Sequence, residues 1–140
     1  MAGPIFVVRI FFLIALLNFS TITSASSEKV VYHLHSNSLT LFIITVNNLE
    51  NLFHGLNDDI EIRLLLQGES INLLNPASIS ENLALRLDNL IQKGVMIETS
   101  RKNYQENEFF LDHKNIPILI DNVFSRVIEL QRMGYRYITP

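Results

Sequence analysis

The feature that most constrains this fold is an alternation of strand-like and helix-like segments that runs from residue 29 to residue 140. Short β-branched or aliphatic segments fit strands, and the longer segments between them carry apolar residues at helical spacing. Helices between successive strands imply right-handed crossovers and a mainly parallel sheet. The sequence therefore predicts a single three-layer α/β domain, with a five-stranded sheet and helices on both faces. The expected strands are 30–35, 60–66, 95–99, 116–120 and 135–138.

Local signals predict where the helices begin and end. The first helix runs from Leu39 to near Gly55, and a capping-box pair, Ser78 and Glu81, precedes the second. Asp121 is expected to cap the third helix. Gly94 and Gly134 are placed to end the second and third helices. Pro117 favours an edge position for the fourth strand, because proline cannot donate a ladder hydrogen bond.

The first 25 residues have the pattern of a secretory signal peptide. Arg9 is followed by an eight-residue apolar run and then by small residues, with Thr23 and Ala25 suited to the peptidase pocket. Cleavage there would give a periplasmic or secreted protein that begins near residue 26. The alternative is an uncleaved membrane anchor, although the apolar stretch is shorter than the roughly 20 residues of a spanning helix.

The absence of cysteine removes several kinds of chemistry at once. Without thiols, disulfides, cysteine-ligated zinc, iron–sulfur ligation and cysteine nucleophiles are excluded. With a formal charge of −3, the chain also lacks the basic character that supplies most nucleic-acid affinity. No motif indicates a cofactor, and the sequence leans away from an enzyme.

Four segments follow one another along the chain with a distinctive order and spacing: the opening strand 29–34, the strand that ends in Leu66-Gln67-Gly68, the segment 90–95 and the C-terminal segment 129–140. Together they resemble the DsrE/DsrF-like family of small sulfur-relay proteins. This resemblance covers essentially all of residues 29–140. The resemblance implies a five-stranded sheet and a trimer or hexamer, or a hetero-oligomer with a related subunit.

The resemblance also implies where sulfur chemistry would lie. Active members carry a persulfide on a cysteine just after the third strand, and that position falls on Ser100. Serine cannot replace it, because relay needs a polarisable thiolate that accepts and passes on a second sulfur. Gln67 also departs from the family's pattern, because the family's second strand usually ends in His-Gly. We therefore expect this chain to share the fold and the assembly of the family, but not its sulfur-relay activity.

A polar cleft is expected at the carboxyl ends of the strands, where open α/β sheets bind ligands. Arg101 and the helix amino ends would favour an anion there. The alternative is that these residues only cap helices and satisfy backbone groups. The candidate cleft residues are His33, His35, Asn37, Gln67, Gly68, Ser100 and Arg101.

Two other chemistries are conceivable for these residues. His33 and His35 share one strand face at roughly 6–7 Å and, with Glu69, could hold a transition metal. A hydrolase built on Ser100, His35 and Glu69 is also conceivable, but Ser100 lacks the flanking glycines of a nucleophile elbow. Histidine pairs on strands are more often packed or solvated side chains, and nothing in the sequence fixes a third ligand, so no metal or catalytic residue is assigned.

Two apolar features fit an interface between subunits. The triplet Phe109-Phe110-Leu111 lies in an acidic stretch, where it either docks a partner or tucks under the sheet. Tyr135 and Tyr137 alternate with Arg136, which places both aromatic rings on one face of the last strand. Together with the missing thiol, these features favour an exported assembly or small-ligand-binding module. The alternative is a sulfur-metabolism enzyme or a metal or anion binder, with a redesigned site around His35, Gln67, Ser100 and Arg101.

Overall fold

The computed structural model describes residues 26–106 and 117–140. Two sequence predictions, the signal segment 1–25 and the triplet 109–111, lie outside these residues. Within them, no helix has both the length and the apolar character needed to cross a bilayer.

Five parallel strands form one sheet in the order β4-β3-β2-β1-β5. The strands are β1 (Glu28–Leu34), β2 (Ile60–Leu66), β3 (Met96–Ser100), β4 (Ile118–Ile120) and β5 (Arg136–Ile138). The α-helices are α2 (Leu39–Gly55), α3 (Glu81–Gln92), α4 (Arg101–Gln105) and α5 (Val123–Arg132). Two 3-10 helices, η2 (Gly68–Leu74) and η3 (Pro76–Ser78), connect β2 to α3.

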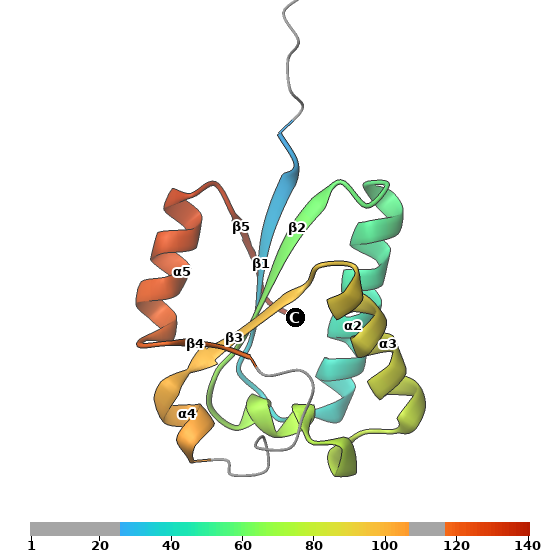
Figure 1. Cartoon of the computed structure of the whole chain (residues 1–140), viewed down its shortest axis with the longest axis vertical. Coiled ribbons are helices and arrows are strands. Elements are labelled where there is room, and N and C mark those ends of the chain that lie inside the picture. Colours follow the sequence, from blue (N-terminus) through green and yellow to red (C-terminus); the bar gives the residue numbers. More distant parts are fainter. Residues whose placement is uncertain (1–25, 107–116) are drawn as a thin grey trace, which may run out of the picture.

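The helices cover the two faces of the sheet unequally. Helices α2 and α3 lie on one side and α5 lies on the other, while α4 sits at the carboxyl end of β3 (Figure 1). The predicted three-layer α/β fold is confirmed, and the sheet is entirely parallel.

Alternating residues of each strand supply the two cores. On β1, Tyr32 and its even-numbered neighbours pack against α2 and α3 in the larger apolar core. Val31 and Leu65 face the other way and pack with Val123, Leu130 and Tyr135 in a smaller core beneath α5. The strand period of two thus sends successive side chains to different helix layers.

Two helix starts differ from the sequence predictions. Ser80, not Ser78, caps α3 by accepting a hydrogen bond from the Leu83 backbone N–H. Ser78 instead ends η3, because Pro76 begins a separate 3-10 turn just upstream. Asn122, not Asp121, caps α5, because its side-chain oxygen is the one that accepts the Ser125 N–H, at 3.0 Å.

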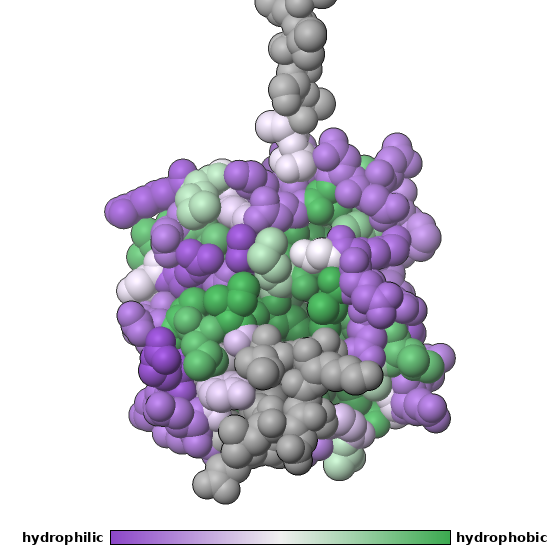
Figure 2. Space-filling view, in the orientation of Figure 1, coloured by the Kyte–Doolittle hydropathy of each residue, from purple (hydrophilic) through white to green (hydrophobic). Residues whose placement is uncertain are grey.

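Other local predictions hold. Gly94 and Gly134 follow the C-cap residues of α3 and α5 and adopt φ of +105° and +92°, the left-handed conformation that suits glycine. Pro117 immediately precedes β4, which is an edge strand. Figure 2 shows hydrophobic surface over β3 and β4, bordered by hydrophilic side chains, and Ile118 is an exposed residue of this edge.

Candidate functional site

His33 lies buried near the carboxyl end of β1, on the α5 face of the sheet. Its Nε2 lies 2.8 Å from Oε1 of Gln67, and its Nδ1 lies 2.8 Å from the Tyr137 hydroxyl. Because an amide oxygen only accepts, Nε2 carries the proton, and Nδ1 accepts from the tyrosine. Burial lowers the pKa of His33 and the nearby His35 adds to this, although the bond to Gln67 opposes it. The ring is therefore a neutral bridge between β2 and β5.

This arrangement does not favour a metal at the histidine pair. Both ring nitrogens of His33 already have partners, and the ring centroids of His33 and His35 are 5.7 Å apart. Glu69, the conceivable third ligand, accepts a hydrogen bond from Asn37 at 2.9 Å. Across 26–106 and 117–140, no group of three histidines or carboxylates is placed to hold a metal ion.

Ser100 ends β3 and acts as the N-cap of α4. Its Oγ accepts a hydrogen bond from the Asn103 backbone N–H at 3.1 Å. Thr99, one residue earlier, donates its hydroxyl to the Leu66 carbonyl on β2 at 2.9 Å. The strand register pairs Thr99 with Leu66, which brings the following residues, Ser100 and Gln67, to the same end of the sheet. The serine hydroxyl thus serves the start of a helix.

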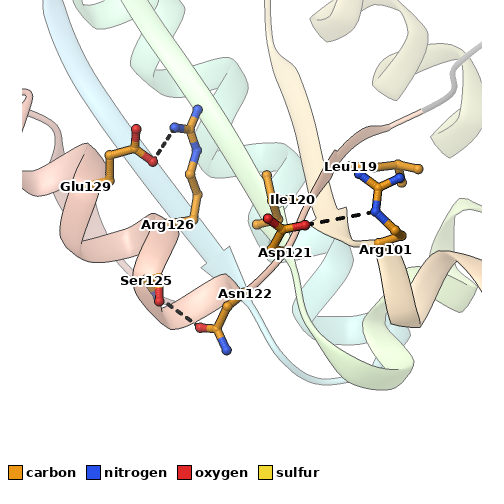
Figure 3. A pocket seen from close by; sticks show the side chains of 8 residues that line it. All are labelled: Arg101, Leu119, Ile120, Asp121, Asn122, Ser125, Arg126 and Glu129. Carbon is orange, nitrogen blue, oxygen red and sulfur yellow. Dashed lines mark hydrogen bonds and ion pairs between the residues drawn. The ribbon is translucent and has the colours of Figure 1, made fainter.

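A cleft of about 350 Å³ lies beside this end of the sheet, between β4 and the start of α5 (Figure 3). Of the seven predicted cleft residues, only Arg101 lines it. Arg101 is half exposed and faces Asp121, with 4.0 Å between Nε and Oδ1. Arg126 and Glu129 form another part of the wall, so the lining carries two guanidinium groups and two carboxylates. The predicted polar site is therefore divided between the His33 bridge and this cleft.

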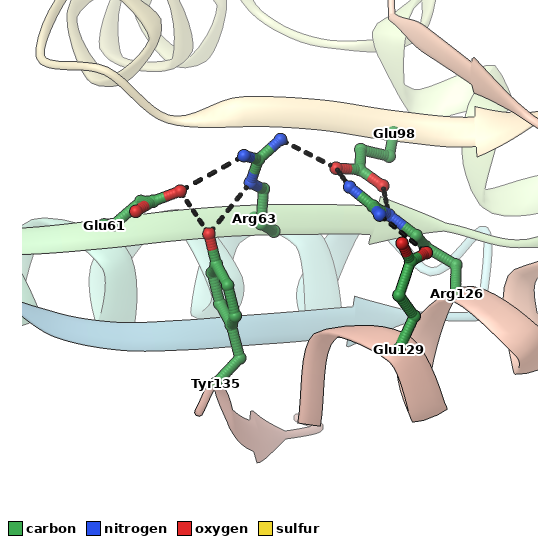
Figure 4. Close-up of polar contacts among 6 residues, drawn as sticks. All are labelled: Glu61, Arg63, Glu98, Arg126, Glu129 and Tyr135. Atoms are coloured by element: carbon green, nitrogen blue, oxygen red, sulfur yellow. Dashed lines mark hydrogen bonds and ion pairs between the residues drawn. The ribbon is translucent and has the colours of Figure 1, made fainter. Parts of the chain in front are cut away.

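The most extensive polar feature beneath α5 is an ion-pair network centred on Glu98 (Figure 4). Glu98 is fully buried on β3, and both of its oxygens are paired with arginines. Nη1 of Arg63 donates at 2.9 Å, while Arg126 donates from Nε at 2.7 Å and from Nη2 at 3.0 Å. The bond to Glu98 is the main reason that the pKa of Arg126 is raised. The fork of Arg126 thus clamps α5 onto β3 with paired, charge-assisted bonds.

The network continues to the other end of β2. Arg63 pairs with Glu61 at 3.1 Å, and the Tyr135 hydroxyl donates a hydrogen bond to the same carboxylate. That bond is the largest of the effects that lower the pKa of Glu61, while burial raises the pKa of Tyr135. Sequence reasoning missed this network. Its signal was the alternation of Glu61 and Arg63 on a strand, which puts two opposite charges on one face of the sheet.

Comparison with known proteins shows the fold and no more. No family model matches the chain, and no curated protein matches it. A solved protein of unknown function from Methanobacterium thermoautotrophicum, MTH1491, is similar with a TM-score of 0.66 and 18% identity, over 81% of this chain and 99% of that one. A conserved protein of unknown function from Bacteroides thetaiotaomicron, BT1422, has a TM-score of 0.56 and 12% identity, over 84% and 99% of the two chains. Both similarities concern the fold alone.

Proposed function

We propose that this chain is an exported, DsrE-like subunit that works by protein–protein assembly rather than by sulfur transfer. A five-stranded α/β sheet is what the sequence resemblance implies, and the sheet found here is consistent with it. At the end of β3, where active relatives would hold the persulfide, the side chain is a serine that caps α4. Without a thiol, the chain has no group that can carry sulfur.

The observation that carries the assembly proposal is the apolar outer surface of α5. Phe124 is 63% exposed and Ile128 is 52% exposed, although they lie one turn apart on the same helix. A single exposed apolar residue is ordinary, whereas adjacent large ones favour an interaction surface. Tyr137 on the edge strand β5 is also 41% exposed. A partner that covered these side chains would remove them from water.

Native mass spectrometry of the full-length chain, purified from the exported fraction, tests this proposal. We expect a mass that lacks residues 1–25 and corresponds to an oligomer, alone or with a cysteine-bearing relative that is co-expressed. A monomer at every concentration, with and without such a relative, would refute assembly. A retained leader would refute cleavage but not assembly.

A second experiment tests the resemblance itself. Ser100→Cys places a thiol where the resemblance puts the relay cysteine, and Ser78→Cys is a matched control at an exposed serine at the end of η3. With a persulfide donor, we expect Ser100→Cys to take up sulfur faster than Ser78→Cys, because a relay pocket lowers the thiol pKa. Equal rates would mean that no relay pocket persists, and the DsrE-like assignment of this site would fail.

The cleft at Arg101 supports a second candidate function, the binding of a small anion. Its volume of about 350 Å³ suits a ligand of a few heavy atoms, and Arg101 offers a guanidinium that is 4.0 Å from the Asp121 carboxylate. Titration with thiosulfate and with inorganic phosphate checks this candidate. Saturable binding that Arg101→Gln abolishes would support it, and the lack of saturable binding to the unmodified chain would remove it.

A further inference from the structure

The cleft between β4 and α5 is lined by charged side chains that differ in how firmly they are held (Figure 3). All three guanidinium nitrogens of Arg126 donate hydrogen bonds to Glu98 or Glu129, at 2.7–3.0 Å. The Arg126 side chain is only 19% exposed, and Glu98 is fully buried. This guanidinium is therefore committed to the protein and forms a fixed part of the wall.

Arg101 and Asp121, by contrast, form a loose and exposed pair. Nε of Arg101 lies 4.0 Å from Oδ1 of Asp121, and the two side chains are 56% and 97% exposed. The strand register pairs Ser100 of β3 with Ile120 of β4. Arg101 and Asp121 follow these residues directly, so they meet at the carboxyl ends of the two strands, where open α/β sheets bind ligands. Because their distance is too long for a direct hydrogen bond, both charges are available to a ligand.

This charged pair favours a ligand that carries both signs of charge. An anion that approaches Arg101 also approaches the carboxylate of Asp121, which repels it, and a cation is repelled by the guanidinium. A zwitterion avoids both costs, since its carboxylate accepts hydrogen bonds from the guanidinium while its ammonium group donates to the carboxylate. In an α-amino acid these two groups are attached to the same carbon atom, so they can reach two side chains that face one another.

The remaining lining suits an apolar side chain on such a ligand. Leu119 and Ile120 are partly buried residues of β4 and give the cleft an apolar part beside the charged pair. The volume of about 350 Å³ lies within the range of small-molecule pockets. An aliphatic side chain would lose apolar surface to water less than a purely polar ligand gains, because it is buried against β4. The lining therefore favours an aliphatic amino acid over a small inorganic anion.

We propose that the cleft binds a free aliphatic α-amino acid, with its carboxylate on Arg101 and its ammonium group on Asp121. The side chain of the ligand packs against Leu119 and Ile120. This inference rests on the second candidate function, the binding of a small anion in this cleft, and narrows the ligand to a zwitterion. The bonds of Arg126 to β3 keep another part of the wall in place.

Isothermal titration calorimetry of the full-length chain with L-leucine and two matched analogues tests the proposal. Isocaproate is leucine without its amino group, and isoamylamine is leucine without its carboxylate. We expect L-leucine to bind saturably and roughly fivefold more tightly than either analogue, because each analogue leaves one member of the charged pair without a partner. Isocaproate that binds as tightly as L-leucine would overturn the zwitterion, and the lack of saturable L-leucine binding would overturn the whole inference.

Two charge-removing variants test which side chains make the contacts. Arg101→Gln should abolish the preference for L-leucine over isoamylamine, and Asp121→Asn should abolish the preference for L-leucine over isocaproate. Asp58→Asn and Lys93→Gln are the matched controls, because they remove an exposed ion pair outside this cleft. Both controls should bind L-leucine as the unmodified chain does. Cleft variants that keep both preferences, or controls that weaken binding equally, would contradict the assigned contacts, and circular dichroism establishes that each variant is folded.

These outcomes separate the inference from the anion-binding candidate on which it rests. Saturable binding of thiosulfate or inorganic phosphate without saturable binding of L-leucine would overturn the zwitterion and leave the anion candidate. If none of these solutes binds, both fail. Neither result bears on assembly through α5, which native mass spectrometry tests.

Discussion

On the α2–α3 face of the sheet, two helices bury a large core of apolar side chains, and the buried Thr45 and Thr99 hydroxyls there donate to backbone carbonyls. On the opposite face, α5 alone covers a small apolar core, and a buried carboxylate, two arginines and a neutral histidine lie beneath or beside it. The first face holds the domain together by removing apolar surface from water. The second is held by directional polar bonds. We infer that stability is concentrated on one face and recognition on the other.

The comparison predicts its largest effect in the apolar core. Phe42 is fully buried on α2, where its ring packs in the core formed with β1 and β2. Phe42→Ala should lower the free energy of unfolding by about 4 kcal/mol, because it removes apolar contacts and leaves a cavity. Urea denaturation measures this loss. A cost below that of the polar substitutions on the α5 face would mean that the α2–α3 face is not the dominant source of stability.

The next largest effect is expected at the centre of the ion-pair network. Glu98→Gln keeps the shape of the side chain but leaves Arg63 and Arg126 without their shared negative charge. Arg63 keeps Glu61 and Arg126 keeps Glu129, but both lose the buried carboxylate that joins them, so the free energy of unfolding should fall by about 3 kcal/mol. The same substitution should speed amide exchange in α5, since the clamp to β3 is lost. Unchanged exchange in α5 would contradict the role of the clamp.

A third effect concerns pH. The pKa of His33 is lowered from its ordinary value of 6.5 in the folded state, chiefly by burial. Below about pH 6.5 the unfolded chain therefore binds a proton that the folded chain does not, so stability falls as pH drops from 6.5 toward the lowered pKa. Chemical denaturation of the wild type and of His33→Gln between pH 7 and pH 5 measures this. The variant should lose less stability on acidification, and parallel curves would contradict the buried, neutral state of His33.

The smallest effect is expected for Glu50→Gln, which is the matched control for Glu98→Gln. Glu50 pairs with Arg86 between α2 and α3, at 2.6 Å, but both side chains are partly exposed. The bond from Arg86 is the main reason that the pKa of Glu50 is lowered. Glu50→Gln should cost less than about 1 kcal/mol, because solvent screens such a pair. If Glu50→Gln and Glu98→Gln cost the same in urea denaturation, burial would not be what distinguishes the two faces.

Much of the fold could be predicted from the sequence because its signals are local. The alternation of β-branched and helical segments fixed the element order, and Gly94 and Gly134 marked two helix ends. Helix starts were less certain, since Ser78 and Ser80, or Asp121 and Asn122, are chemically similar and only backbone geometry selects the cap.

The candidate site was predictable only in part. Both His33 and Gln67 were expected at the carboxyl ends of their strands, and the structure joins them. Glu98 looked like an ordinary residue of a buried strand, and its partners lie 35 and 28 positions away in the sequence. Such pairing depends on which helix crosses which face, and that is a property of topology rather than of local pattern.

Hydrogen exchange on the full-length chain, measured at protein concentrations well below and well above self-association, tests the division between the faces most directly. The account predicts that assembly slows amide exchange in α5 (Val123–Arg132), whereas exchange in α2 and α3 stays the same. Protection that appears in α2 or α3 instead, or exchange in α5 that does not depend on concentration, would contradict it.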